Sequence, residues 1–201
     1  MKTGIRVAVS ASVIALGAWF MVPVKAQTDD IFAFIPSGGR TLLMESIAAG
    51  TPADELMKLL VGKHSRDEWL VYLKSQAEAL KGVSDLDEYQ LLTLADYLSF
   101  NMPRPADKIP ADLASAAWDA ILPRDGRDLV LTYCQSCHII TVVITQDRTK
   151  DAWLGTMNKP SHVEIDTTEA EREALASYLV INAGIPIDLV PEDLRAGGAS
   201  Y

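Results

Sequence analysis

Apolar side chains recur at three- and four-residue spacing in long segments of this chain, which is the pattern of amphipathic helices. Near the C-terminus, Thr168 and Glu171 have the spacing of a capping box, which marks the start of a helix. The predicted helix carries Leu175, Tyr178 and Leu179 along one face. The pattern predicts an all-α protein whose helices are joined by turns rich in proline and glycine.

A second amphipathic helix is predicted earlier in the chain, before Pro103. A helix is predicted to begin at residues 84–87 and to carry Leu94 and Tyr97 on its apolar face. Pro103 ends it, because proline lacks the backbone donor that a helix needs. Residues 102–110 are rich in proline and indicate an irregular linker, after which a short helix is expected through residues 113–121.

The chain contains an internal repeat. Gly-Arg-x-Leu begins at residues 39 and 126, Asp-x-Trp-Leu at residues 67 and 151, and Leu-Ala-x-Tyr-Leu at residues 94 and 175. The offsets fall from 87 to 84 to 81, so two length changes of three residues reconcile the copies. Three motifs in one order indicate two copies of one unit.

The repeat supplies the domain boundaries. We expect an export segment at residues 1–26, a first repeat at residues 27–103 and a linker with a short helix at residues 104–125. A second repeat follows at residues 126–190, and a tail at residues 191–201.

The first 26 residues have the layout of a secretory signal peptide. Lys2 and Arg6 form a basic region, and an apolar run of about 16 residues follows. The run leads to Val24-Lys25-Ala26, whose outer residues suit a signal peptidase, so cleavage is predicted after Ala26. An uncleaved membrane anchor is the alternative, since the apolar run is only a few residues short of a span. With the signal removed, no membrane span is expected.

The mature chain is predicted to be strongly acidic. Removing the three basic residues of the signal leaves 15 Lys and Arg against 27 Asp and Glu, a formal charge of −12. This balance argues against binding to nucleic acid or anionic lipid, and it favours a partner with a basic face.

Both cysteines of the chain lie in one pentapeptide, Cys134-Gln135-Ser136-Cys137-His138. The spacing C-x-x-C-H is the attachment signature of c-type haem: the two thiols add across the haem vinyl groups, and the histidine binds the iron. A thiol redox pair or half of a zinc site are the alternatives, but each needs a sequence context that this chain lacks. We expect one covalent haem c, attached outside the cytoplasm and therefore in a bacterial periplasm.

The first repeat lacks this chemistry. Ile47, Gly50 and Thr51 occupy the positions matched to Cys134, Cys137 and His138. The first repeat is therefore predicted to hold no haem and to fill the corresponding space with apolar side chains. After the haem histidine, residues 139–144 are rich in β-branched side chains and are expected to be extended along one face of the haem.

Residues 126–184 resemble a small class I cytochrome c, which has a haem-bearing N-terminal helix, a mid-chain tryptophan and a C-terminal helix with Tyr-Leu. The mature chain resembles tandem cytochrome c domains of which the first has lost its haem. The resemblance implies electron transfer, haem attachment at Cys134 and Cys137, and His138 as the proximal iron ligand.

The resemblance also implies a distal ligand, usually a methionine sulfur. Met157 is the predicted ligand, since it is the only methionine after His138 and its counterpart in the first repeat is Leu73. Some cytochromes of this type place the methionine nearer to residue 160, which is Pro160 here. His162 is an alternative that gives two histidine ligands, an open site is another, and Met157 can also be an ordinary core residue.

Two further side chains are candidates for binding the haem propionates. Trp153 offers an indole N–H and Arg148 a guanidinium. The recurrence of tryptophan as Trp69 in the first repeat favours a packing role for Trp153 instead.

The expected function is single-electron transfer, as a periplasmic carrier or as the cytochrome subunit of a periplasmic dehydrogenase. The alternatives are a haem enzyme of the peroxidase type, which needs an open iron position and acid–base groups, and a haem-based sensor. The single haem motif and the few catalytic candidates around it favour the carrier.

Overall fold

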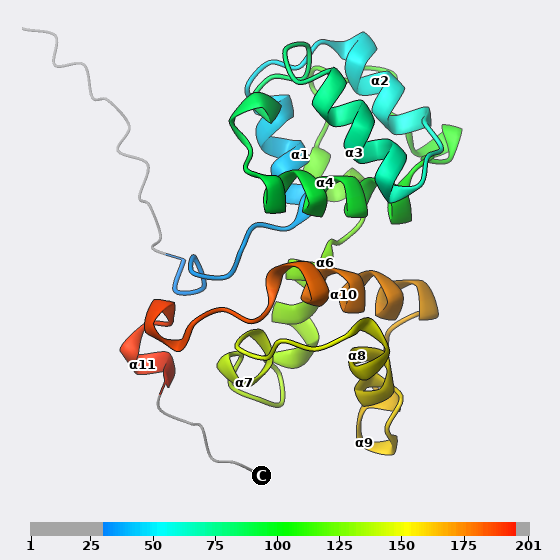
Figure 1. Ribbon diagram of the computed structural model, residues 1–201. Coiled ribbons are helices and arrows are strands. Elements are labelled where there is room, and N and C mark those ends of the chain that lie inside the picture. The colour runs from blue at the N-terminus through cyan, green and yellow to red at the C-terminus, as the bar shows by residue number, and fades with distance from the viewer. Residues whose placement is uncertain (1–29, 196–201) are drawn as a thin grey trace, which may run out of the picture. The chain divides into compact units, whose positions relative to one another are not determined.

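The computed structural model describes residues 30–195, where helices are joined by turns and no strand occurs (Figure 1). The all-helical prediction is confirmed for these residues. The first repeat and the linker contain α1 (Gly39–Ala48), α2 (Ala53–Val61), α3 (Arg66–Ser75), α4 (Glu88–Asn101) and α5 (Trp118–Ile121). Further on lie α6 (Gly126–Leu129), α7 (Thr141–Ile144), α8 (Lys150–Met157), α9 (Pro160–Val163), α10 (Glu169–Asn182) and α11 (Glu192–Arg195).

The predicted signal peptide lies outside the described residues. Within residues 30–195, no helix combines the length and the apolar character that a membrane crossing requires. All of the helices named above belong to one compact unit that begins at Ile31.

The helix α10 begins at its predicted capping box, and α4 begins at Glu88, directly after the predicted start at residues 84–87. At α10, Thr168 accepts a hydrogen bond from the Glu171 backbone N–H, and the Glu171 carboxylate accepts one from the Thr168 N–H. At α4, Asp87 and Gln90 form the same reciprocal pair. Each pair satisfies backbone donors that the first turn of a helix leaves unpaired.

Two hydrophobic cores correspond to most of each repeat, except that Ile35, from the range assigned to the first repeat, is buried in the second core. The first core is built by helices α1 to α4 and extends into the linker, whose Trp118 and Leu122 are buried against it. The short helix expected over residues 113–121 is confined to α5. The second core contains Leu129, Ile144 and Leu175. The linker is therefore a packed part of the first core, since its apolar side chains gain more from burial than from exposure to water.

One contact recurs at matched positions of the repeats. Gly39 begins α1 and lies against Tyr97 of α4, while Gly126 begins α6 and lies against Tyr178 of α10. A Cβ atom at either glycine would overlap the tyrosine side chain. The absence of a side chain thus lets the first helix of each repeat cross its last helix closely.

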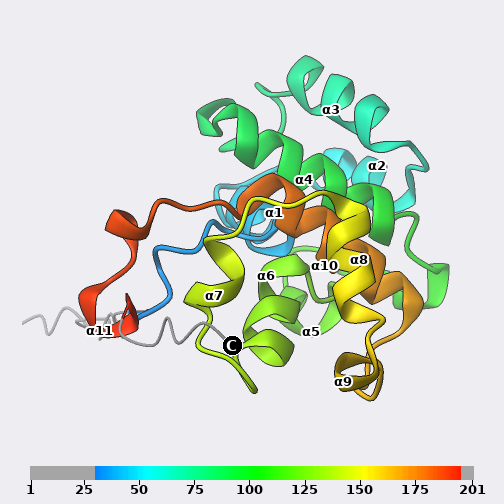
Figure 2. The same cartoon turned by 60° about the horizontal axis from the view of Figure 1, so that its bottom comes forward.

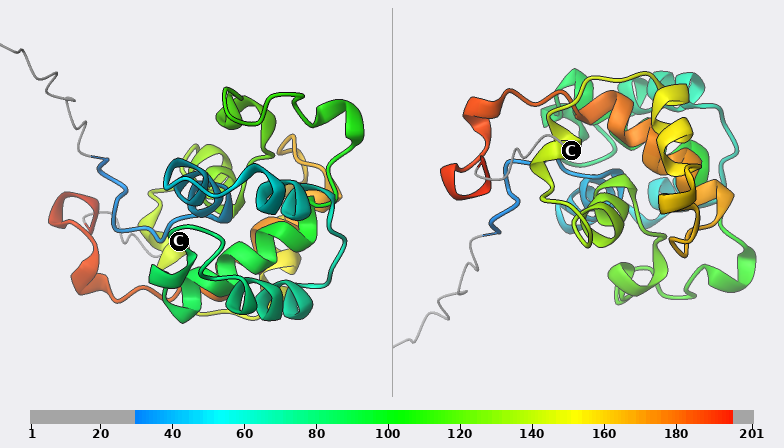
Figure 3. Two further views of the ribbon diagram at one scale, coloured as in Figure 1. Left: turned by 90° about the horizontal axis from the view of Figure 1, so that it is seen from above. Right: turned by 90° about the horizontal axis from the view of Figure 1, so that it is seen from below.

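The helices α4 and α10, which occupy matched positions in the repeats, pack against each other (Figures 2 and 3). Across this contact, Ser177 Oγ donates to Asp96 Oδ1 over 2.7 Å, and Asn182 Nδ2 donates to Thr93 Oγ1 over 3.0 Å. All four side chains are buried. Because buried polar groups are costly unless paired, these bonds specify how the two helices meet.

A single carboxylate caps two helices. Asp125 is the N-cap of α6, where its Oδ1 accepts from the Asp128 N–H over 3.0 Å. Its Oδ2 accepts from the Arg40 N–H at the start of α1 over 2.9 Å. The N-cap of α1 is Gly38, the residue matched to Asp125, and the Asp125 side chain occupies the space beside it. Asp125 therefore joins the starts of both repeats at their helix N-termini, where negative charge is favourable.

The buried carboxyl group of Asp96 should make stability depend on pH. Burial raises the pKa of Asp96, opposed by the hydrogen bond from Ser177. A folded-state pKa above the unfolded value means that the contribution of Asp96 to stability is full below about pH 3.9 and is lost as pH rises through the folded-state pKa. The variant Asp96→Asn cannot ionise and keeps an oxygen for Ser177, so it should gain stability relative to the natural chain as the pH increases. Urea unfolding of both proteins at pH 5 and pH 8 measures this difference, and a difference that does not change between the two pH values contradicts the prediction.

Candidate functional site

The two cysteines lie at the end of one continuous helical segment. The helix α6 runs directly into a π-helical turn, η3 (Val130–Cys134), in which the Gln135 N–H donates to the Val130 carbonyl. Next, the His138 N–H donates to the Cys134 carbonyl over 3.1 Å. Turns of the π type occur often at functional sites. Here the turn brings Cys134, Cys137 and His138 within about one helical turn of each other.

The two residues between the cysteines hold this turn in place. Ser136 Oγ donates to the Tyr133 carbonyl over 2.7 Å. The side-chain oxygen of Gln135 accepts from the Ile140 N–H over 2.8 Å, which ties the motif to the segment that follows it. The motif is thereby held by its own side chains as well as by its backbone.

The segment after the motif differs from its prediction. Residues 139–144 were expected to be extended, but Thr141–Ile144 form the helical turn α7. The expectation is wrong because packing outweighs the strand preference of β-branched residues. Ile140, Val143 and Ile144 are spaced as one helix face and are buried in the second core.

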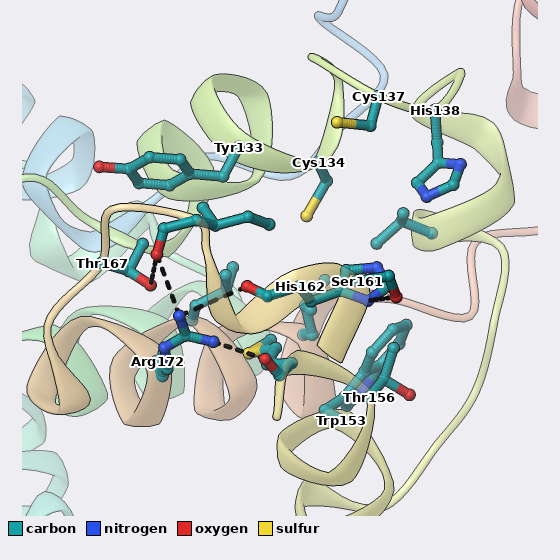
Figure 4. A pocket seen from close by; sticks show the side chains of 15 residues that line it. Tyr133, Cys134, Cys137, His138, Trp153, Thr156, Ser161, His162, Thr167 and Arg172 are labelled. Carbon is teal, nitrogen blue, oxygen red and sulfur yellow. Dashed lines mark hydrogen bonds between the residues drawn. The ribbon is translucent and has the colours of Figure 1, made fainter. Parts of the chain in front are cut away.

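The motif faces a cavity of about 350 Å³ in the second repeat (Figure 4). Cys134, Cys137 and His138 line it together. The remaining lining residues come from helices α7 to α10 and the loops between them, with Tyr133 preceding the motif: Tyr133, Val143, Trp153, Thr156, Met157, Ser161, His162, Ile165, Thr167, Arg172, Leu175 and Leu179. The lining is mainly apolar with a few polar groups, as in sites that bind small molecules and cofactors. We call this space the haem-motif cavity.

The thiols differ in environment. Cys134 is half-buried, whereas Cys137 is exposed. Burial raises the pKa of the Cys134 thiol to about 11, so it is protonated at neutral pH. For the zinc alternative, residues 30–195 contain no group of three or more His, Cys, Asp or Glu side chains that could hold a metal ion.

The helix α8 contributes two of the predicted site residues to the cavity, namely Trp153 and Met157. The indole N–H of Trp153 is buried without a hydrogen-bond partner, and so is that of Trp69 in the first repeat. Since both repeats share this feature, it does not single out Trp153 as a ligand for a propionate.

Arg148 is not among the residues that line the cavity. Its guanidinium carbon lies 4.9 Å from the centre of the Trp153 ring, and its Nη1 donates to Thr156 Oγ1 over 3.1 Å. The stacking on Trp153 is a cation–π contact. In this arrangement Arg148 supports the wall that Trp153 forms, and its proposed contact with a propionate stays a prediction.

The loop of residues 157–165 carries α9 along the edge of the cavity and is anchored by Arg172. The Arg172 guanidinium donates to the carbonyl oxygens of Met157 over 2.5 Å, Ile165 over 3.0 Å and Val163 over 3.2 Å. A guanidinium suits this task because its donors are fixed in a plane. Sequence reasoning missed Arg172; its only signal is a basic residue within the acidic first turns of α10.

A second anchor holds Asp166, the residue that directly follows this loop. Tyr133, directly before Cys134, donates from its hydroxyl to the Asp166 carbonyl over 2.8 Å. Arg124 donates to the same hydroxyl over 3.0 Å and forms an ion pair of 2.6 Å with Glu171. Tyr133 and Arg124 therefore join the haem motif to the start of α10, a link between residues too far apart in the chain to be seen in the sequence.

In the first repeat, the side chains matched to two residues of the haem-motif cavity are buried in a core. Trp69 and Leu73, which match Trp153 and Met157, are fully buried. They belong to a core that includes Leu56, Leu59 and Leu60 of α2, all 2% exposed or less. The apolar filling predicted for the first repeat agrees with this packing.

Comparisons of the chain with protein-family models, with curated proteins and with solved structures found no match.

Proposed function

We propose that this chain is a mono-haem c-type cytochrome that carries single electrons in the periplasm, as a carrier or as the cytochrome subunit of a dehydrogenase. The observation that supports this most strongly is that Cys134, Cys137 and His138 line one mainly apolar cavity. Its volume of about 350 Å³ falls within the range of roughly 300–1,000 Å³ that is usual for small-molecule and cofactor sites. The donor set fits haem c, with two thiols for covalent attachment and an imidazole for the iron.

The residues around the cavity have distinct tasks in this proposal. Haem, when bound, supplies an iron that gains or loses one electron. Cys134 and Cys137 hold the group covalently, and His138 binds the iron from the side of the motif. Trp153, Leu175 and other apolar residues exclude water, which helps to set the reduction potential. Because Cys137 and His138 are exposed, one edge of the site reaches the surface, where a redox partner can approach.

We also infer that the two repeats are tandem cytochrome c-like domains and that the first lacks haem. The contacts of Gly39 with Tyr97 and of Gly126 with Tyr178 support a common architecture. The first repeat has no thiol or imidazole at the positions matched to the motif.

A role in docking is proposed for the first repeat. The formal charge of −12 for residues 27–201 favours a periplasmic redox protein or dehydrogenase with a basic face, because such charge guides encounter and orientation. A repeat that keeps its core without a cofactor has surface available for this task. The second repeat would then carry the electron.

A spectroelectrochemical titration tests the proposed function. The full-length protein, matured with haem, should show one reversible wave with the slope of a one-electron couple. The reduced protein should not bind carbon monoxide readily, because in an electron carrier His138 and a second side chain of this protein would hold the iron and leave it no open position. Rapid carbon monoxide binding together with turnover of peroxide would instead support the enzyme alternative, and carbon monoxide binding without turnover would support a sensor.

A further inference from the structure

The imidazoles of His138 and His162 lie close together in the lining of the haem-motif cavity. Their ring centroids are 6.2 Å apart, and their planes are inclined by 28°. Figure 4 shows both residues at the cavity. Both residues line the cavity, although they come from different segments, the end of the motif turn and α9. Two imidazoles that open into one cavity are unusual for a packed core, because each neutral ring exposes a nitrogen that needs a partner.

The spacing of the two rings fits a shared metal ion. A metal–imidazole bond is about 2.0 Å long and a ring nitrogen lies about 1.2 Å from its ring centre, so two imidazoles on opposite sides of one ion have centroids about 6.4 Å apart. The observed separation is 6.2 Å.

We propose that His162, through its Nε2 atom, is the second axial ligand of the iron, opposite His138. This inference rests on the proposed function, since it concerns the same haem. It assigns the distal position to an imidazole and departs from the sequence-based choice of Met157.

Ser161 orients the His162 ring. Its hydroxyl oxygen lies 2.9 Å from His162 Nδ1. When Nδ1–H donates to this oxygen, Nε2 carries the lone pair that a metal needs. Histidine ligands in metalloproteins almost always donate their other N–H in this way, and the bond fixes both the tautomer and the ring orientation. Ser161 is thus a positioning residue for the proposed ligand.

Arg172 holds the backbone that carries His162. Besides its bonds to Met157, Val163 and Ile165, its Nη2 is 3.5 Å from the His162 carbonyl. The helix α9 has only four residues and could not hold a ligand in place by its own hydrogen bonds. The anchoring by Arg172 supplies the rigidity that the helix lacks.

Met157 has a packing role that does not require iron. Its counterpart Leu73 is fully buried in the core of the first repeat, so this position is a core position even where no haem is expected. Met157 itself packs against the second core. A flexible thioether is well suited to filling the irregular space beside a cofactor.

The test compares His162→Ala with Met157→Leu, each in the full-length chain matured with haem. The ferric natural protein should be low-spin, with a near-infrared magnetic circular dichroism band typical of two histidine ligands and no sulfur-to-iron band. Met157→Leu, which mimics the first repeat, should keep this spectrum. His162→Ala should become high-spin, and added imidazole should restore the low-spin spectrum. Because His162 is only partly buried on a short helix, its replacement does not threaten the fold.

The variant Ser161→Ala tests whether Ser161 orients the His162 ring. It should keep the low-spin spectrum but change the reduction potential and the electron paramagnetic resonance g-values, because the ligand loses its hydrogen-bond partner. A sulfur-to-iron band in the natural protein that is lost in Met157→Leu would overturn the assignment. A high-spin natural protein would also overturn it. The absence of covalent haem from all of the variants and from the natural chain would instead refute the proposed function.

Discussion

Replacing Cys134 and Cys137 together by serine should abolish covalent haem while leaving the helical fold in place. Serine is similar in size to cysteine, Cys137 is exposed, and Cys134 is only partly buried where it packs against the second core, so the core should tolerate both replacements. A hydroxyl does not form the bond to haem that a thiol forms, so any haem taken up would be released by denaturation. Each single variant should retain haem through one remaining bond, in lower yield.

Haem staining after denaturing electrophoresis measures the covalent attachment, and far-ultraviolet circular dichroism measures the helix content. The control is Ser136→Ala, which changes the same turn without removing a thiol. If the double variant kept covalent haem at the natural level, the motif would not be the attachment site.

Gly126→Ala should destabilise the protein strongly, whereas the same substitution at Gly155 should not. At Gly126 a Cβ atom would overlap the Tyr178 side chain, so α6 and α10 would have to separate. Overpacking of this kind costs about 1–3 kcal/mol. Gly155 lies within α8, and a Cβ atom there would meet no other atom within 4 Å. Alanine favours the helix, so Gly155→Ala should stabilise by about 0.5–1 kcal/mol.

Chemical unfolding of the two variants tests this pair of predictions. Both variants replace glycine by alanine. A change in the free energy of unfolding that differs in sign between them therefore reports the close approach of α6 to α10. Equal shifts of the unfolding midpoint in both variants would contradict the described contact between Gly126 and Tyr178.

Local patterns in the sequence were sufficient to predict much of the fold. The predicted capping box located the start of α10, and residues 84–87 and Pro103 located the start and the end of α4 to within a few residues, because these features depend on residues close together in the chain. The extended stretch at residues 139–144 was predicted incorrectly. There, burial of Ile140 and Ile144 against distant residues decided the conformation, and strand preference did not.

The long-range features could not be predicted. Asp125 caps α1 as well as α6, and that depends on Gly38 leaving space for a side chain 87 positions further along the chain. Burial of the linker against the first core likewise follows from tertiary packing, since its prolines indicated only irregular structure.

In the candidate site too, the residues defined by local spacing were predicted, and the residues that act through distant contacts were not. Cys134, Cys137 and His138 were found by their spacing, because attachment of haem requires them within one turn. The residues that support the cavity were not found. Arg172 and Tyr133 act on backbone carbonyls of a distant loop, and such partners leave no pattern in the sequence.

If the proposed function holds, the protein carries one covalent haem c, in its second repeat. Intact mass spectrometry of the mature protein, combined with a pyridine haemochrome assay of the same sample, measures this directly. We expect a mass that exceeds that of the polypeptide from residue 27 onward by one haem, and a haem-to-protein ratio of one. A mass equal to that of the bare polypeptide, or a haem that is lost on extraction with acidic acetone, would contradict it.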